Sequence, residues 1–190
     1  MPEDEYMSSL RWCRTKEEFE KLWDTTKFNW KDNSWRLAQG CWRYFDIWWD
    51  KDKYVWEQNA YNLAYSCSDS ISRWWDPDKF NWDEDSWILA GRCAEYFNIW
   101  WDKDRYNWVR SSAGLSECCH EYFKIWWDAD KYNWNFSVQL SKFCYEYINI
   151  WWDPICVKPH RGLITRLRKH SKWSEKKIKQ EMVKVKLLHN

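Results

Sequence analysis

A block of 26 residues recurs along most of this chain and limits the folds it can adopt. Six aspartates that each follow a tryptophan are spaced by 26, 26, 26, 26 and 25 residues, and they are Asp24, Asp50, Asp76, Asp102, Asp128 and Asp153. A short repeat cannot bury its apolar side chains alone and has to stack on its neighbours. We therefore expect five tandem units over residues 25–153, after a capping half-repeat at 1–24 and before a different segment at 154–190.

The third unit shows which secondary structure to expect. It reads DPDKFNWDEDSWILAGRCAEYFNIWW. Leu89, Cys93, Tyr96 and Trp100 follow the i, i+4, i+7, i+11 spacing of one helix face. We expect a short helix or turn after the aspartate and then one long helix over residues 86–101. Only four glycines and four prolines occur, too few for a many-stranded β protein. The prediction is an all-α, solenoid-like array with a partly helical C-terminal segment.

The repeated apolar positions predict the core of the stack. Each unit places a leucine and a cysteine on the same helix face and ends in a tryptophan pair. We expect inter-repeat burial at Leu37, Cys41, Trp49, Leu63, Cys67, Trp75, Leu89, Cys93, Trp101, Leu115, Cys119, Trp127, Leu140, Cys144 and Trp152.

The cysteines and the aspartates favour structural roles. One cysteine per helix on a packed face behaves as a small apolar residue, and no C-x-x-C occurs. Cys118-Cys119-His120 is the one local cluster, without a second pair at zinc spacing. The Asp-x-Asp pairs recur in four units and lack the glycine of a calcium loop, which favours helix capping. We expect no metal, no cofactor and no catalytic residue set.

A third tryptophan follows each aspartate and has two interpretations. An exposed ladder of these rings would anchor a protein partner or stack the bases of a single-stranded nucleic acid. Packing between repeats is the alternative. The candidate partner-binding residues are Trp30, Trp56, Trp82, Trp108 and Trp134.

The charge is divided unevenly along the chain. Residues up to Asp153 hold 19 Lys/Arg and 27 Asp/Glu, a net charge of −8, whereas the remaining residues hold 11 and 2, a net of +9. A basic segment of this kind binds nucleic acid, an anionic membrane or an acidic protein, or it docks on the acidic repeats. Within residues 158–190, the candidate anion-binding residues are Arg161, Arg166, Arg168, Lys169, Lys172, Lys176, Lys177 and Lys179.

Location and origin follow from weaker signals. We expect no transmembrane segment and no secretory signal, because no apolar run is long enough and the first residues are acidic. An intracellular location, cytoplasmic or nuclear, is therefore expected. Over residues 23–153 the pattern WWDPDKFNW…LA..C.EYF.IWWD resembles tryptophan-rich tandem repeats in uncharacterised proteins of large DNA viruses and phages. That resemblance implies a viral origin, and then a place in the virion.

These observations indicate a general class of function and no specific biochemical activity. The preferred hypothesis is a non-enzymatic helical scaffold for protein–protein interaction, whose basic segment engages an anionic partner. The alternatives are a nucleic-acid-binding repeat protein that uses Trp/Tyr stacking and the basic segment, and a structural component of a virion or another large assembly, which includes self-assembly.

Overall fold

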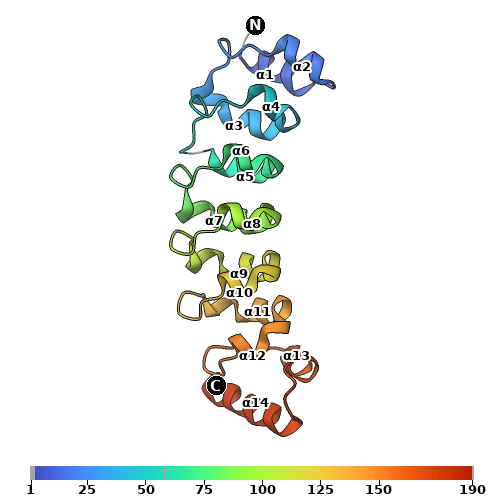
Figure 1. Cartoon of the computed structure of the whole chain (residues 1–190), viewed down its shortest axis with the longest axis vertical. Coiled ribbons are helices and arrows are strands. Elements are labelled where there is room, and N and C mark those ends of the chain that lie inside the picture. The colour runs from blue at the N-terminus through green and yellow to red at the C-terminus, as the bar shows by residue number, and fades with distance from the viewer. Residues whose placement is uncertain (1–2, 58, 190) are drawn as a thin grey trace. The chain divides into compact units, whose positions relative to one another are not determined.

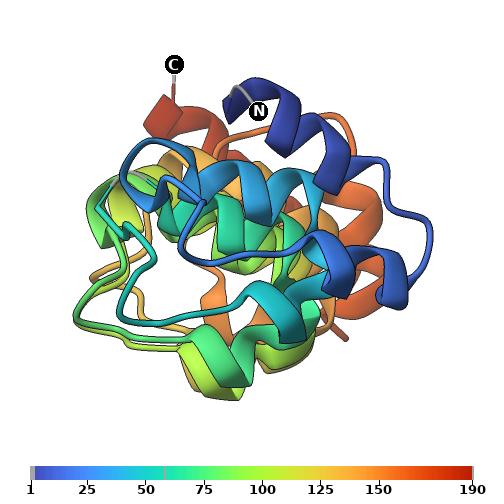
Figure 2. The same cartoon turned by 90° about the horizontal axis from the view of Figure 1, so that it is seen from above.

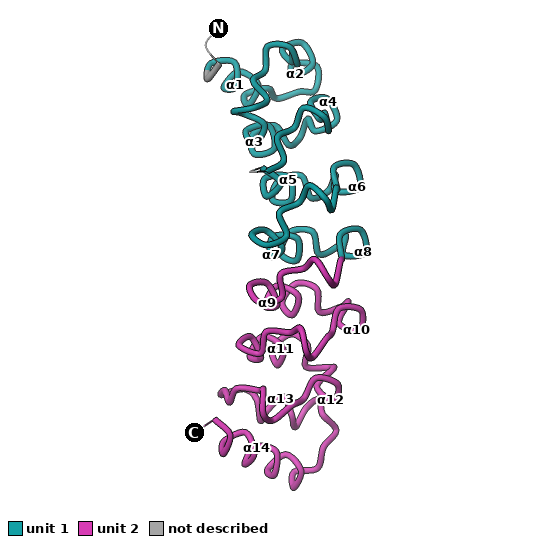
Figure 3. The backbone as a smooth tube through the Cα atoms, turned by 90° about the vertical axis from the view of Figure 1, so that its left-hand side faces the viewer, with its two compact units in different colours: residues 1–101 teal, residues 102–190 magenta. Residues whose placement is uncertain are grey.

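The computed structural model describes residues 3–57 and 59–189, and this part of the chain is all-α, as the sequence predicts (Figure 1). The chain divides into two compact units, Met1–Trp101 and Asp102–Asn190 (Figure 3). Each unit is built from helical repeats and is described by itself.

In the first unit, each of the three repeats over residues 25–101 contributes a first helix, a 3-10 turn and a one-turn second helix, and α1 and α2 precede them. The first helices α3, α5 and α7 pack side by side in that order, and they lie nearly parallel in the blue-to-green ribbons of Figure 2. The helices are α1 (Glu3–Arg11), α2 (Lys16–Leu22), α3 (Trp30–Gly40), α4 (Phe45–Trp48), α5 (Ala60–Ser66), α6 (Ile71–Trp74), α7 (Trp82–Arg92) and α8 (Phe97–Trp100), with 3-10 turns η1 (Trp42–Tyr44), η2 (Ser68–Ser70) and η3 (Ala94–Tyr96).

The second unit continues the pattern for two repeats and ends in two further helices. Here α9 packs against α11, and α13 packs against both the 3-10 turn η6 and α14. The helices are α9 (Trp108–Cys118), α10 (Phe123–Trp126), α11 (Ser137–Phe143), α12 (Ile148–Trp151), α13 (Leu163–His170) and α14 (Glu175–His189), with 3-10 turns η4 (His120–Tyr122), η5 (Trp134–Phe136) and η6 (Tyr145–Tyr147).

The long helix predicted over residues 86–101 is wrong, because the chain leaves helical geometry at Cys93. That residue has φ −114° and ψ 24°, and it separates α7 from η3 and α8. The Cys93 carbonyl accepts a hydrogen bond from Trp100 Nε1 at 2.7 Å. The same carbonyl also accepts the Tyr96 N–H at 3.0 Å, so both of its acceptor positions are used at the break.

The same bond recurs at every break. The donor is always the first tryptophan of the closing pair, and the acceptor is the cysteine carbonyl seven residues earlier. The donor–acceptor pairs, with their N···O distances, are Trp48–Cys41 (2.8 Å), Trp74–Cys67 (2.7 Å), Trp126–Cys119 (2.8 Å) and Trp151–Cys144 (2.8 Å).

Of the two forms expected after Asp76, a short helix or a turn, the structure has the turn, at residues 77–79. The Asp76 carboxylate accepts the Asp78 N–H at 3.1 Å, and the Asp76 carbonyl accepts the Phe80 N–H at 3.2 Å. The helix that follows starts earlier than expected, at Trp82, because the Asn81 side chain accepts the Glu84 N–H at 3.3 Å and caps it. Asparagine is among the best N-cap residues for this reason.

The leucine and cysteine positions of the predicted core are buried. The leucines Leu37, Leu63, Leu89, Leu115 and Leu140 are 0 % exposed, and the cysteines are at most 4 % exposed. For the tryptophan pairs, the prediction chose the wrong member. Trp49, Trp75, Trp101, Trp127 and Trp152 are half-buried, whereas the first members are fully buried: Trp48, Trp74, Trp100, Trp126 and Trp151.

Polar contacts also join successive repeats within each unit. The Cys93 thiol donates to the Ala64 carbonyl, with the sulfur 3.6 Å from the oxygen, and the Cys144 thiol donates likewise to Ser116 at 3.7 Å. The buried Ser112 hydroxyl accepts the Asn133 N–H at 3.1 Å. Small serine and cysteine side chains thus let neighbouring helices approach closely. They also form hydrogen bonds with backbone groups between successive repeats.

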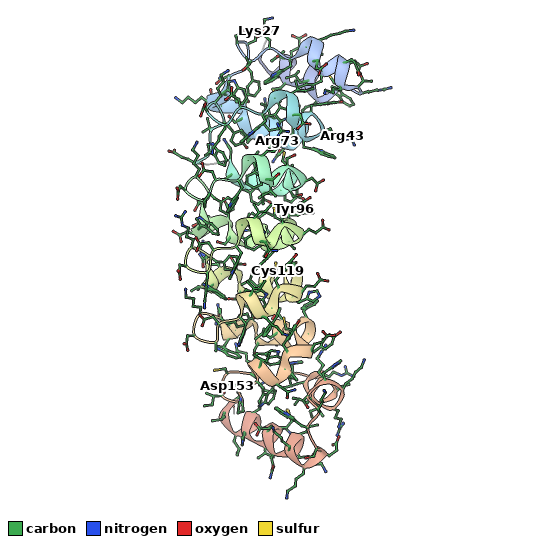
Figure 4. All side chains as sticks on the ribbon, in the orientation of Figure 1. Lys27, Arg43, Arg73, Tyr96, Cys119 and Asp153 are labelled. Atoms are coloured by element: carbon green, nitrogen blue, oxygen red, sulfur yellow. The ribbon has the colours of Figure 1, made fainter. Side chains whose placement is uncertain are left out.

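The C-terminal segment begins as a partial sixth repeat. Asp153, labelled in Figure 4, starts a turn in which its carbonyl accepts the Val157 N–H at 2.9 Å, and Val157 is fully buried. The Trp173 ring meets Trp152 edge to face at 5.4 Å, as Trp134 meets Trp127 at 5.7 Å. The basic segment is therefore packed on the second unit as helices, with the apolar side of α14 buried at Ile178, Met182 and Val185.

Candidate functional site

The five tryptophans proposed as exposed partner-binding residues are not exposed. Trp56 and Trp108 are 7 % and 8 % exposed, and Trp30, Trp82 and Trp134 are half-buried. An exposed ladder for stacking bases or binding a partner is therefore not present at these positions. The prediction of exposure is wrong because local contacts hold each ring against its own repeat.

Those local contacts are the same in each repeat. The indole N–H donates to the backbone carbonyl five residues earlier, which belongs to the aspartate turn. Within each unit, Trp30, Trp56, Trp82 and Trp134 also meet an earlier half-buried tryptophan edge to face, as Trp82 meets Trp75 at 5.5 Å. The N···O distances are 3.3 Å for Trp30–Thr25, 3.3 Å for Trp56–Lys51, 2.8 Å for Trp82–Pro77, 2.9 Å for Trp108–Lys103 and 3.0 Å for Trp134–Ala129.

The repeated aspartates stabilise turns and bridge repeats. The Asp128 carboxylate accepts the Asp130 N–H at 2.9 Å and pairs with Lys103 Nζ at 2.8 Å. Its hydrogen bond to Lys103 holds the pKa of Asp128 below the ordinary value. Asp76 pairs likewise with Lys51 at 3.0 Å. No group of three His, Cys, Asp or Glu side chains in the described residues could hold a metal ion.

The repeat thiols are buried and protonated. Burial raises the pKa of Cys41, Cys67, Cys93 and Cys144 to about 12. A thiolate is the reactive form of cysteine, so these four side chains are poor nucleophiles near neutral pH. Their role is packing, together with the weak S–H donation described above. Cys119, labelled in Figure 4, occupies the equivalent buried position in the second unit.

A different set of aromatic side chains lies at the surface of the first unit. We call Tyr61, Tyr65, Trp87 and Arg92 the aromatic–arginine surface. Tyr65 is 45 % exposed and Trp87 is 47 % exposed, on the neighbouring helices α5 and α7. Large aromatic rings this exposed on adjacent helices are unusual for a surface that contacts only water.

The geometry of this surface is defined by ring contacts. Tyr61 stacks on Tyr65 at 5.7 Å with 23° between the planes, and Tyr61 meets Trp87 at 5.8 Å. The Arg92 guanidinium lies over the Tyr65 ring at 4.3 Å from its centroid. These contacts fix the orientation of the rings across two repeats, so little side-chain entropy remains to be lost on binding.

Sequence reasoning missed this surface although a signal for it exists. Trp35, Tyr61 and Trp87 occupy the same place in three successive repeats, 26 residues apart, and Tyr65 follows Tyr61 by one helical turn. This position is aromatic only in the first three repeats and is Ala113 in the fourth, so it is not part of the pattern that all units share.

The predicted basic residues divide into two groups in the second unit. Arg161, Arg166 and Lys169 lie at or near α13 and line one pocket with Lys142 of α11. The others lie apart from it. Arg168 pairs with Glu175 at 2.9 Å, Lys177 lies over the Trp173 ring at 4.2 Å, and Lys172, Lys176 and Lys179 are exposed.

Comparisons with models of protein families, with curated proteins and with solved structures found no match to this chain. Among the described residues, no helix combines the length and the apolar character needed to cross a lipid bilayer.

Proposed function

We propose that this chain is a non-enzymatic helical scaffold that binds a protein partner through the aromatic–arginine surface of the first unit. The observation that carries the proposal is the ordered, half-exposed group of Tyr65, Trp87 and Arg92 on two neighbouring repeats. Tryptophan, tyrosine and arginine are the residues most enriched at the energetic centres of protein interfaces. The basic C-terminal segment engages a second, anionic partner.

The roles of the remaining polar groups support a scaffold over an enzyme. The aspartates are engaged in turns and ion pairs, and the repeat thiols are buried with raised pKa values. The five repeated indole N–H groups of Trp30, Trp56, Trp82, Trp108 and Trp134 are each bonded to a backbone carbonyl. The residues that recur in every repeat therefore stabilise the stack, and the residues that vary between repeats are available to bind the partner.

Site-specific photo-crosslinking tests the proposal. A photoreactive phenylalanine at Gly91 suits the test because a β-carbon there meets no atom within 4 Å and the position lies one helical turn after Trp87. In cells that express the chain, we expect one protein to be cross-linked from Gly91. Trp87→Ser and Tyr65→Ser should each abolish that adduct while far-UV circular dichroism stays unchanged.

A matched control uses Ile99, which is 42 % exposed on α8 of the same unit. The same photoreactive residue at Ile99 should not give the adduct, and Ile99→Ser should not weaken the adduct formed from Gly91. Equal cross-linking from both positions, or an adduct that survives Trp87→Ser, would show that the aromatic–arginine surface does not bind the partner.

Nucleic-acid binding through the basic segment is a second candidate function. The observation that favours it is the cluster of cations on α11 and α13. It predicts that a single-stranded oligonucleotide binds with an affinity that falls steeply with salt. Because the stacking tryptophans are packed away, this function would depend on charge alone.

A further inference from the structure

A pocket of about 530 Å³ lies in the second unit between α13 and the end of α11. Its wall carries four basic side chains: Lys142, Arg161, Arg166 and Lys169. None of the four forms an ion pair with any described residue, in contrast to Arg168 and Lys184, which pair with Glu175 and Glu181. Four unpaired cations around one hollow repel each other, and an anion between them would remove that repulsion.

The positive charges at the pocket also lower the pKa of the neighbouring His160. His160 is held by the Ser141 hydroxyl at 2.6 Å from its Nε2. Burial lowers its pKa, and the charges of Arg166 and Lys142 lower it further. Lys142 and Arg166 therefore act on the same small volume, although they come from different helices.

The start of α13 adds donors to the same wall. Gly162 is the N-cap residue and supplies no side chain to cap the helix. The first-turn N–H groups of Ile164 and Thr165 have no acceptor among the described residues, and Thr165 lines the pocket. Backbone N–H groups at a helix start, next to cations, match the oxygens of a phosphate group.

Gly162 has a second role in shaping the pocket. A β-carbon at this position would collide with the Arg166 guanidinium, which folds back over the glycine. The absence of a side chain thus places Arg166 at the pocket. Gly162 has φ −90°, so alanine fits the backbone there, and only the arginine side chain would have to move.

We propose that this pocket binds a phosphate monoester carried by a phosphorylated segment of the protein partner. A compact dianion fits better than a long phosphodiester strand, because the adjoining pocket, which shares Lys142 and Tyr145, carries the carboxylates of Glu121 and Glu146. A strand continuing across those acids would be repelled. The phosphate group follows from the pocket itself, and its origin in a protein partner depends on the proposed function above.

The test uses the full chain labelled with ¹⁵N and four probes at equal ionic strength: inorganic phosphate, a glycine–serine peptide with one phosphoserine, its unphosphorylated form, and a single-stranded RNA. We expect phosphate and the phosphopeptide to shift the backbone N–H signals of Gly162, Thr165 and Arg166, and the unphosphorylated peptide to leave them unchanged. Gly162→Ala keeps every charge and should weaken phosphopeptide binding about tenfold, as loss of one charged hydrogen bond does.

Two variants separate the pocket from general positive charge. Arg161→Gln with Lys169→Gln should reduce binding more than tenfold, whereas Lys176→Gln with Lys179→Gln on α14, which removes the same charge, should change it less than twofold. Equal losses in both, or no shift at Thr165, would overturn the proposal. Tighter binding of a single-stranded RNA than of the phosphopeptide would assign the cations to nucleic acid instead. None of these results depends on the cross-linking from Gly91, so the two proposals fail separately.

Discussion

Replacing Trp74 by phenylalanine should destabilise the protein far more than the same change at its neighbour Trp75. Trp74 is 0 % exposed, and its indole N–H bonds the Cys67 carbonyl at 2.7 Å. Phenylalanine cannot donate this bond, and the Cys67 carbonyl then keeps only the Ser70 N–H at 3.0 Å, so one hydrogen bond worth about 0.5–1.5 kcal/mol is lost. The smaller ring also leaves a cavity, which adds about 1 kcal/mol on the scale of large-to-small core changes.

The expected loss for Trp74→Phe is therefore about 1.5–2.5 kcal/mol in the free energy of unfolding. Trp75 is half-buried, and its indole N–H bonds no described residue, so Trp75→Phe should cost less than about 1 kcal/mol. Urea denaturation followed by circular dichroism gives both values from the shifts in the transition midpoint. If Trp74→Phe shifts the midpoint no more than Trp75→Phe does, the N–H···O=C bond at the helix break does not stabilise the repeat.

Three further outcomes follow from the structure. Burial raises the pKa of Cys93 to about 12, so iodoacetamide at pH about 8 should label the exposed Cys118 well before Cys93 in the folded protein, and equal labelling rates by mass spectrometry would contradict the buried position. Gly91→Ala should raise the free energy of unfolding by about 0.5–1 kcal/mol, because the added methyl group meets nothing on the exposed face of α7, and a lower melting temperature would contradict this. The pKa of Asp128 is held below its ordinary value of 3.8 chiefly by Lys103, so the stability from this pair is present above that pH and is lost as pH falls further. Lys103→Met should therefore lower the urea midpoint at pH about 7 and have a smaller effect at pH about 2, and equal effects at both pH values would refute the assignment.

The array itself could be predicted from the sequence because its signal is repeated. A leucine and a cysteine four residues apart, such as Leu89 and Cys93, occur in every unit. This helical spacing was enough to predict the all-α class and the burial of both residues. The start of α14 could be predicted because it depends on a contact between residues close in the sequence. The Ser174 hydroxyl accepts the Lys177 N–H at 3.3 Å and caps α14, as expected of serine before a helix.

The helix break and the exposed surface could not be predicted in the same way. Nothing in the apolar period over residues 86–101 marks Cys93 as the end of a helix, since the break is stabilised by Trp100, seven residues later. Which tryptophan of a pair is buried depends equally on this bond. The aromatic residues 26 apart are apparent in the sequence, but the exposure of Tyr65 and Trp87 depends on how α5 packs beside α7 and is not.

Hydrogen exchange of the indole N–H groups, followed by ¹H–¹⁵N spectroscopy, distinguishes structural tryptophans from those left for recognition. Five indoles that bond the cysteine carbonyls should exchange slowly, and Trp87, which is 47 % exposed, should exchange as fast as a free indole. Slow exchange of Trp87, or fast exchange of any of the five, would contradict the division of the chain into a tryptophan-built stack and a separate binding surface. The five protected residues are Trp48, Trp74, Trp100, Trp126 and Trp151.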